Sequence, residues 1–398
     1  MSSELKSSVN TDADVRLRHV TPAFRTFCGN DALRGLAREL DRTGAQRAVI
    51  VTVPAILAHQ DAVDRLHAAL GDRLAGVYDG VVEHSPLPAV EEARRFLADH
   101  RADVVIAVGG GSAVVTARAA SIMLAEDRDI RELCTQRGAD GSLVSPKLNA
   151  PKLPQWVIPS TPTSAYAKAG AAVRDPDTGE RLALYDPKIR AQGVALDPVV
   201  ALTAPERLAR SASLNVLSMA VEGLLSTTED PLADALLAHA LRTVVEWLPR
   251  LQSEPDAAAP RLQLMLAALM SGQGGDFTGG GLAQALSHAI GPRSSEANGV
   301  VEALLLPHAM RFVADVVPHR FALIGDVLRV QDRNPETIVD AVATVLASFA
   351  VPTRLRDVAV TQDALIESAN HAMDDWAITA GPRTPSRQEV VDLLTNAW

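Results

Sequence analysis

The pattern of apolar residues changes near residue 200, and this change constrains the fold more than any other feature. Before it, short apolar runs at 47–53, 103–112 and 155–164 alternate with stretches of helical periodicity. Such alternation predicts a parallel β-sheet with helices on both faces. Beyond it, long patterns rich in Ala and Leu predict helices only. We therefore expect an α/β domain over residues 19–200 and an all-helical domain over residues 201–398.

The composition is that of an acidic globular protein. A length of 398 residues is enough for two domains, and the net charge of −10 argues against nucleic acid, whose phosphates it would repel. Two distant cysteines, Cys28 and Cys134, argue against a disulfide framework and against a cysteine-rich zinc site. The composition of residues 1–18 predicts a disordered leader. No apolar stretch is long enough for a membrane span, so we expect a cytoplasmic protein.

Two polar turns each follow an apolar run. The first, GGGS at 109–112, opens a helical pattern, and its glycines would let the backbone approach a pyrophosphate closely. The second, PSTPTS at 159–164, offers hydroxyl groups. Taken singly, each motif is equally compatible with a purely structural turn. Because the carboxyl ends of parallel strands share one edge of a sheet, the two turns together predict a single binding crevice.

The order of motifs along the chain resembles the iron-containing alcohol dehydrogenase superfamily. The motifs are AVGGGS, IPSTPTS, RDPDTGER, LNVLSMAVEG, GGGLAQALSHAIG and EANGVVEALLLPHAM, and the resemblance extends from about Phe27 to Trp398. Asn215 and the tail GPRTPSRQEVVDLLTNAW look most like the maleylacetate reductase branch. The resemblance implies the fold of dehydroquinate synthase-like proteins and iron-containing alcohol dehydrogenases. In that fold an α/β dinucleotide-binding domain precedes an all-helical domain, with the active site in the cleft between them.

The same resemblance implies a site for NAD(P)H. The residues that match the family's cofactor-binding positions are Gly109, Gly110, Gly111, Ser112, Ser160 and Thr161, together with Arg181, where the family usually has Lys. Three features on the cofactor side depart from the family. Val115 stands in place of an Asp, Arg118 in place of a Lys, and the residues PTSAY at 162–166 replace the usual turn.

The metal ligands of the family are replaced in this chain. The matching positions hold Asn215, Met219, Gln284 and Asn298, where metal-binding members have an Asp and three His. Three amides and a thioether bind Fe²⁺ or Zn²⁺ poorly. We therefore expect no catalytic divalent metal, and we interpret the four residues as the lining of a substrate pocket.

Three further residues are candidates for chemistry. His288 matches a family active-site position and is the best candidate acid or base, because an imidazole titrates near neutral pH; a packing histidine is the alternative. Tyr166 could donate a proton, although a buried aromatic with a satisfied hydroxyl is at least as good an interpretation. Arg293 could pair with a substrate carboxylate, although loop arginines are usually only solvated.

These features favour a metal-independent, NAD(P)H-dependent reductase that acts on a small carbonyl or activated C=C substrate. The alternative is a non-redox enzyme, such as an isomerase, lyase or cyclase, that uses the same interdomain cleft. A catalytically inactive binding protein is a third hypothesis. By the same resemblance we expect a homodimer.

Overall fold

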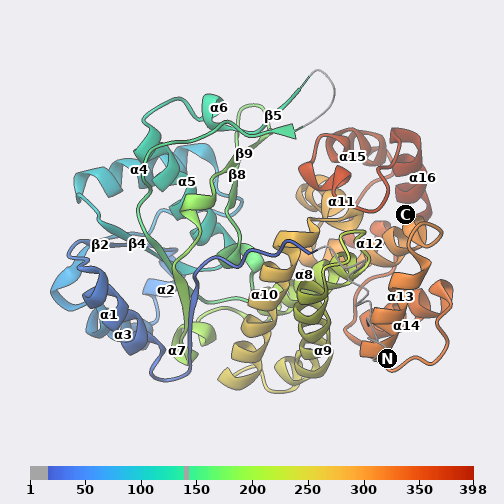
Figure 1. The fold of residues 1–398 in the computed structure, drawn as a ribbon, viewed down its shortest axis with the longest axis horizontal. Helices are drawn as coiled ribbons and strands as arrows, with labels where there is room; N and C mark the ends of the chain where they lie inside the picture. The colour runs from blue at the N-terminus through green and yellow to red at the C-terminus, as the bar shows by residue number, and fades with distance from the viewer. Residues whose placement is uncertain (1–16, 139–142) are drawn as a thin grey trace, which may run out of the picture.

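A computed structural model describes residues 17–138 and 143–398 and has an α/β domain beside a helical one (Figure 1). The last strand of the described chain ends at Leu196, and every later element is a helix. The all-helical second half is therefore confirmed. Of the expected leader, only Leu17 and Arg18 fall within the described residues, and both are exposed. No described helix is long and apolar enough to cross a membrane.

The α/β domain is built on a six-stranded parallel sheet with the strand order β1-β10-β7-β4-β2-β3. Its strands are β1 (Arg25–Cys28), β2 (Ala48–Val51), β3 (Leu74–Tyr78), β4 (Val104–Gly109), β7 (Gln155–Pro159) and β10 (Gly193–Leu196). Every residue of β2, β4, β7 and β10 is buried. Continuous apolar runs have this property when helices cover both faces of a sheet.

Helices pack on both faces of the sheet and create two apolar cores. The helices of this domain are α1 (Ala32–Thr43), α2 (Pro54–Leu57), α3 (Gln60–Leu70), η1 (Gly71–Arg73), α4 (Leu87–Asp99), α5 (Gly111–Glu126) and α6 (Ile130–Leu133). Helices α1 and α3 cover one face and form a core of their own with the sheet. Helices α4 and α5 cover the other face, and their core continues into the helical domain.

Two antiparallel strand pairs, which the sequence pattern did not indicate, accompany the main sheet. They are β5 (Gln136–Arg137) with β6 (Leu143–Val144), and β8 (Gly170–Arg174) with β9 (Arg181–Tyr185). The β8–β9 hairpin turns at Asp175, whose Oδ1 accepts from the backbone N–H of Asp177 at 2.9 Å. Gly179 then adopts a φ of 72°, which favours glycine. The short helices η2 (Ser164–Ala167) and η3 (Pro187–Ile189) flank this hairpin in the chain.

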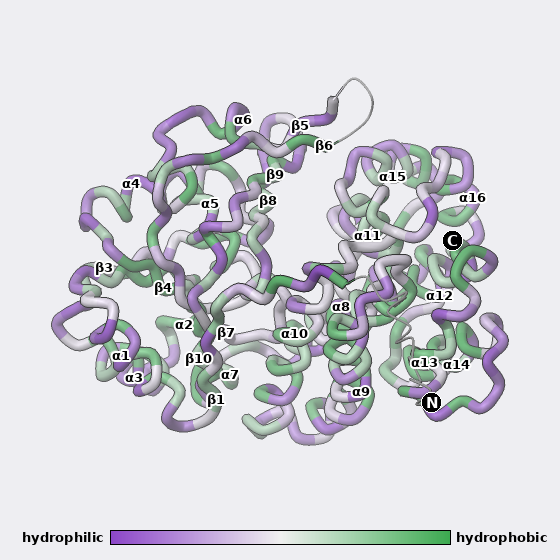
Figure 2. Tube along the Cα trace, in the orientation of Figure 1, coloured by the Kyte–Doolittle hydropathy of each residue, from purple (hydrophilic) through white to green (hydrophobic). Residues whose placement is uncertain are grey.

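The helical domain is organised around long buried helices. Its helices are α7 (Pro198–Leu202), α8 (Glu206–Leu224), α9 (Pro231–Ser253), α10 (Ala258–Thr278), α11 (Leu282–Ile290), η4 (Gly291–Arg293), α12 (Asn298–Val313), η5 (Pro318–Arg320), α13 (Phe321–Leu328), α14 (Pro335–Ser348), η6 (Leu355–Val358), α15 (Ala364–Met373), η7 (Trp376–Thr379) and α16 (Arg387–Ala397). Helix α8 packs against α9, α10 and α12. Figure 2 shows hydrophobic residues on these inner elements and hydrophilic ones mostly along the periphery.

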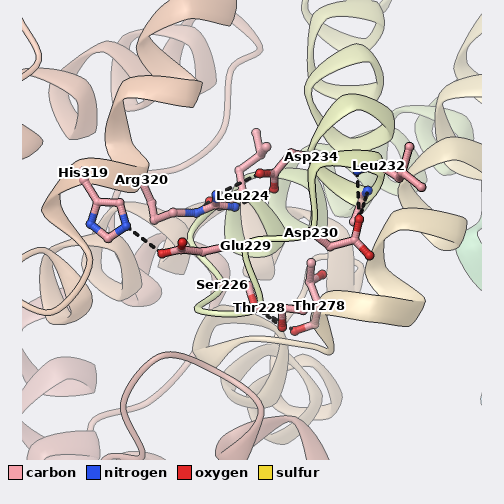
Figure 3. Close-up of polar contacts among 11 residues, drawn as sticks. Leu224, Ser226, Thr228, Glu229, Asp230, Leu232, Asp234, Thr278, His319 and Arg320 are labelled. Atoms are coloured by element: carbon pink, nitrogen blue, oxygen red, sulfur yellow. Dashed lines mark hydrogen bonds and ion pairs between the residues drawn. The ribbon is translucent and has the colours of Figure 1, made fainter. Parts of the chain in front are cut away.

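A polar cluster holds the carboxyl end of α8 in place (Figure 3). Arg320 donates from Nε to the carbonyl of Leu224 at 2.9 Å and from Nη1 to Asp234 Oδ2 at 2.8 Å. Asp230 caps α9 by accepting from the backbone N–H of Leu232 at 2.8 Å. A bidentate arginine that also binds a helix-terminal carbonyl fixes both direction and position. The far end of α8 is therefore anchored independently of the candidate site.

The N-terminal segment connects the two domains. Figure 1 shows it, in dark blue, running from the α/β domain across to the helices. His19 Nδ1 lies 2.7 Å from Asp230 Oδ2, and its ring stacks on Phe277 with centroids 3.7 Å apart. The described chain before β1 therefore packs on the helical domain. The expected homodimer stays a prediction; β1, which that segment precedes, is an edge strand of the sheet.

We predict that Gly299→Ala destabilises the protein, because helices α8 and α12 touch at this glycine. A Cβ there would lie 1.9 Å from the carbonyl oxygen of Ser211. Overpacking of this kind costs about 1–3 kcal/mol, whereas alanine in a helix is otherwise favoured over glycine by about 1 kcal/mol. Urea denaturation should therefore show a lower free energy of unfolding. Gly381→Ala is the control, because its Cβ would have nothing nearer than 4.0 Å. Equal stability of Gly299→Ala and the parent would contradict the packing.

Candidate active site

The glycine turn and the polar turn lie against each other at the carboxyl edge of the sheet. Gly109 ends β4 with a φ of 138°, a value that favours glycine. A Cβ on Gly110 would lie 3.1 Å from Thr161 Oγ1, and one on Gly111 would lie 3.2 Å from Thr163 Oγ1. The structure thus brings together the two turns that were expected to share one crevice. Helix α5 begins here without a side-chain cap, so its first N–H groups can face an anion.

The other expected cofactor residues surround the same turn. The backbone N–H of Ser160 donates to the carbonyl of Gly109 at 3.0 Å, which ties the ends of β7 and β4 together. Ser160 and Thr161 are largely buried beside it. Ser112 sits in the first turn of α5, where its carbonyl accepts from Ser85 Oγ at 3.2 Å. Their assignment to the cofactor stays a prediction.

Arg118, one of the departures from the family, has a structural task. It is fully buried on α5 and donates to the carbonyls of Ala165 at 2.8 Å and Gly170 at 2.7 Å. Burial lowers its pKa to about 9, and the charge of Arg190 acts in the same direction. The guanidinium therefore fixes the backbone within η2 and at the start of β8. Val115, the other replaced position on α5, packs on the apolar core.

Tyr166 lies inside the protein and not at an accessible surface. Its side chain is fully buried in η2, and its hydroxyl donates to the carbonyl of Met265 on α10 at 2.5 Å. Burial raises the pKa of the phenol well above its ordinary value. This geometry favours the structural interpretation of Tyr166 over the role of proton donor, because its one proton is already engaged.

Two of the four residues expected at metal-ligand positions, Asn215 and Met219, lie on α8. Asn215 donates from Nδ2 to Glu302 Oε2 on α12. Met219 accepts at its sulfur from Ser164 Oγ at 3.2 Å, a contact between the two domains. Met219 therefore lies where the polar turn meets the helical domain, and Asn215 precedes it on the same helix.

The other two of these residues, Gln284 and Asn298, lie on α11 and α12. Gln284 donates its backbone N–H to Glu222 Oε2 at 3.2 Å, while its own Oε1 has no hydrogen-bond partner among the described residues. Asn298 is the first residue of α12, and its Oδ1 occupies the space that a Cβ on Gly291 would need. Among residues 17–138 and 143–398, no group of three or more His, Cys, Asp or Glu side chains could hold a metal ion.

Two buried carboxyls that the sequence interpretation had not assigned to the site border these positions. Glu222 accepts from the backbone N–H of Ala283 at 2.7 Å and so caps α11, the helix that carries Gln284 and His288. Burial raises the pKa of Glu222 to about 7. Burial, reinforced by the neighbouring Glu222, raises the pKa of Glu302 well above its ordinary value. The same burial and like charge favour the neutral form of Glu302 over the carboxylate.

His288 forms the centre of a charged group that joins the domains. Its Nδ1 lies 2.8 Å from Asp375 Oδ2, and the same oxygen lies 3.3 Å from Nη1 of Arg181 on β9. Because a carboxylate only accepts, Nδ1 carries a proton, and Nε2 is the nitrogen left for a substrate. Burial lowers the pKa of His288, the charge of Arg181 lowers it further, and Asp375 opposes both.

Arg293 is not an unpaired cation. Its guanidinium lies 2.8 Å from Glu367 Oε1 and donates to the carbonyl of Ala289 at 2.8 Å. It also lies 3.2 Å from Nδ1 of His371. This environment favours a structural role over the expected contact with a substrate carboxylate.

Comparison with known proteins identifies the family. The model described as "Iron-containing alcohol dehydrogenase" matches residues 22–198, and the one described as "Fe-containing alcohol dehydrogenase family, C-terminal" matches residues 210–398. The chain therefore belongs to the iron-containing alcohol dehydrogenase family, whose members are oxidoreductases. The relationship inferred from the motifs is thus confirmed, and so is the fold.

Similar proteins span nearly the whole chain. Lactaldehyde reductase of Escherichia coli is 28% identical over 382 residues, which cover 93% of this chain and 97% of that protein. Maleylacetate reductase 1 of Cupriavidus pinatubonensis is 24% identical over 374 residues, covering 94% and 95%. The structure of an alcohol dehydrogenase from Oenococcus oeni superposes with a TM-score of 0.86 at 21% identity, covering 95% and 98% of the two chains.

We predict that Asp375→Asn lowers the pKa of His288 further, because it removes the one charge that stabilises the imidazolium. Loss of an opposite charge at hydrogen-bond distance should move the titration of His288 to lower pH. An NMR titration of the histidine ring signals measures this, with His288→Gln to assign the resonance. Asp374→Asn is a matched control, since Asp374 is exposed and next in the chain. An unchanged titration in Asp375→Asn would mean that the pair does not form.

Proposed function

We propose that the protein is an NAD(P)H-dependent reductase of a small carbonyl or activated C=C compound and that it works without a divalent metal. One observation carries the proposal. One segment begins at the polar turn, which lies against Gly110. It continues through Ser164, which contacts Met219. It ends at Lys168, which lies over the ring of Trp376, the residue that follows Asp375 in the chain. A cofactor crevice and an acid–base pair are thus joined by a single short stretch of chain.

The residues of the crevice fit a dinucleotide. Gly110 and Gly111 leave room for a close approach of backbone to pyrophosphate, and the uncapped start of α5 supplies N–H donors. Hydroxyls of Ser160 and Thr161 lie beside it, and Arg181 stands at the domain junction. When bound, the nicotinamide would supply a hydride to the substrate.

The remaining chemistry falls to the protein's own side chains. In its imidazolium form, His288 would donate the Nε2 proton to the substrate and keep the Nδ1 proton on its hydrogen bond to Asp375. Without a metal, the developing negative charge on the substrate oxygen would be stabilised by hydrogen bonds. The amides of Asn215, Gln284 and Asn298 are neutral donors for this purpose, in the pocket that a metal occupies in other members.

The non-redox alternative keeps one observation in its favour. The turn at 162–166, which replaces the family's sequence, is immobilised by Arg118 and by the hydroxyl of Tyr166. An isomerase, lyase or cyclase would use His288 as a base in the same place. If neither NADH nor NADPH binds at about millimolar concentration, the affinity is too weak for a cofactor, and this alternative is favoured.

We predict reductase activity that depends on the glycine turn and on His288. NADH fluorescence titration should show binding that Gly110→Val weakens at least about tenfold, because the side chain would press on Thr161 and fill the crevice. With lactaldehyde and maleylacetate as trial substrates, His288→Gln should lower kcat by roughly 10²–10⁴ and leave NADH binding intact. Parental turnover by His288→Gln would remove His288 from the mechanism.

We predict that the purified enzyme carries no stoichiometric iron or zinc and keeps its activity in EDTA. The physical reason is that amides and a thioether stand where imidazole and carboxylate ligands are required. Elemental analysis of protein purified without chelator is the measurement. Near-stoichiometric metal that is lost in Asn215→Ala or Gln284→Ala would contradict the proposal.

A further inference from the structure

Lys168 follows η2 directly, and the backbone around it is held rigidly. Arg118 donates to the carbonyl of Ala165 before it and to that of Gly170 after it. Arg190 donates at 2.8 Å to the carbonyl of the residue immediately preceding Lys168. A lysine on a backbone fixed at three carbonyls is placed with little conformational freedom at its base, so its ammonium can serve one defined location.

The ammonium of Lys168 lacks a partner within the protein. Its Nζ lies 5.9 Å from the ring centroid of Trp376 and forms no hydrogen bond or ion pair with residues 17–138 or 143–398. Burial lowers its pKa, whereas the carboxyls of Glu302 and Asp276 raise it. Neither carboxyl forms an ion pair with it: Glu302 accepts from Nδ2 of Asn215, and Asp276 is 2.5 Å from the guanidinium of Arg190. The side chain is half-buried, and Nζ is not one of the fully enclosed atoms, so a ligand can reach this ammonium.

The other cations near the domain junction are already neutralised. Their carboxylate partners are Asp375 for Arg181, Asp276 for Arg190 and Glu367 for Arg293. The guanidinium of Arg118 donates its hydrogen bonds to backbone carbonyls. In the part of the chain that the structure describes, an anion arriving at the junction therefore finds its free positive charge at Lys168. The charge of Lys168 is also close enough to His288 to depress the pKa of that imidazole.

We propose that Lys168 is the substrate-binding cation of the site and that the substrate carries a carboxylate. The carboxylate would accept from Nζ of Lys168 while the carbonyl or C=C group lies toward Nε2 of His288. No covalent bond is formed or broken at Lys168. The placement of the carbonyl or C=C group toward His288 rests on the proposed reductase function, because hydride transfer needs the cofactor. It narrows the substrate class from small oxo compounds in general to small oxo acids.

The charge of Lys168 and the carboxylate of the ligand can be tested separately. The probe is oxalate, a planar dicarboxylate, and oxamide is its neutral isostere. Isothermal titration calorimetry of the full-length protein should detect oxalate and no oxamide binding. Lys168→Met should weaken oxalate at least about tenfold, the size of effect expected from loss of one charge-assisted hydrogen bond. Lys168→Arg, which keeps the charge, should stay within about tenfold of the parent. Lys147→Met, at an exposed lysine, should match the parent.

The outcomes separate this proposal from the reductase function. NADH titration of the same variants reports cofactor binding and folding, and we expect Lys168→Met to bind NADH as the parent does. If Lys168→Met is unstable, Lys168→Gln takes its place. The comparison of oxalate with oxamide uses the parent protein alone, so it does not depend on any variant folding. Equal binding of oxalate and oxamide, no oxalate binding by the parent at about 10 mM, or parental oxalate affinity in Lys168→Met would each overturn the role of Lys168. Oxalate binding without NADH binding would keep Lys168 and remove the reductase.

Discussion

The carboxylate of Asp375 is the contact on which the candidate site depends, because it accepts from one group of each domain. Its Oδ2 lies 2.8 Å from Nδ1 of His288, which belongs to the helical domain. The same oxygen lies 3.3 Å from Nη1 of Arg181, which belongs to the β8–β9 hairpin. A buried charge costs several kcal/mol unless it is paired, so a shift of either domain would be opposed by the loss of a partner. The orientation of the imidazole and the arrangement of the domains are therefore coupled. A packing change far from the junction can alter the orientation of His288 through this contact.

The parts of the fold that rest on continuous apolar runs could be predicted from the sequence. Strands β4 and β7 are such runs, and the two polar turns that follow them had to lie at the same edge of a parallel sheet. The β8–β9 hairpin was missed because β8 (GAAVR) contains little of the β-branched and aromatic alternation that marks a strand. Its turn, with Asp175 and Gly179, was visible in the sequence but was used only as a family motif.

The candidate site was predictable only where a motif marked it. His288 stands in a recognisable helix, but its partner Asp375 is 87 residues away and has no local signal. Glu302 and Lys168 were missed for a related reason. What distinguishes them is their burial and the charged groups that surround them, and both arise only when the chain folds. Tyr166 and Arg293 show the reverse. Their chemistry is suited to catalysis or binding, yet the structure provides each with a partner of its own.

In a site that works without a divalent cation, as proposed, charge is distributed differently through the pocket. Glu222 and Glu302 are buried close enough to influence each other, and burial together with Glu222 raises the pKa of Glu302 well above its ordinary value. Lys168 forms no ion pair with a carboxylate among the described residues. A single ammonium attracts an oxygen anion about half as strongly as a dication at equal distance and dielectric constant, so neutral donors must contribute the rest. A substrate that brings its own carboxylate balances Lys168, whereas a neutral aldehyde would leave the ammonium half-buried and unpaired. A metal-free site of the kind proposed therefore favours an anionic substrate over a neutral one.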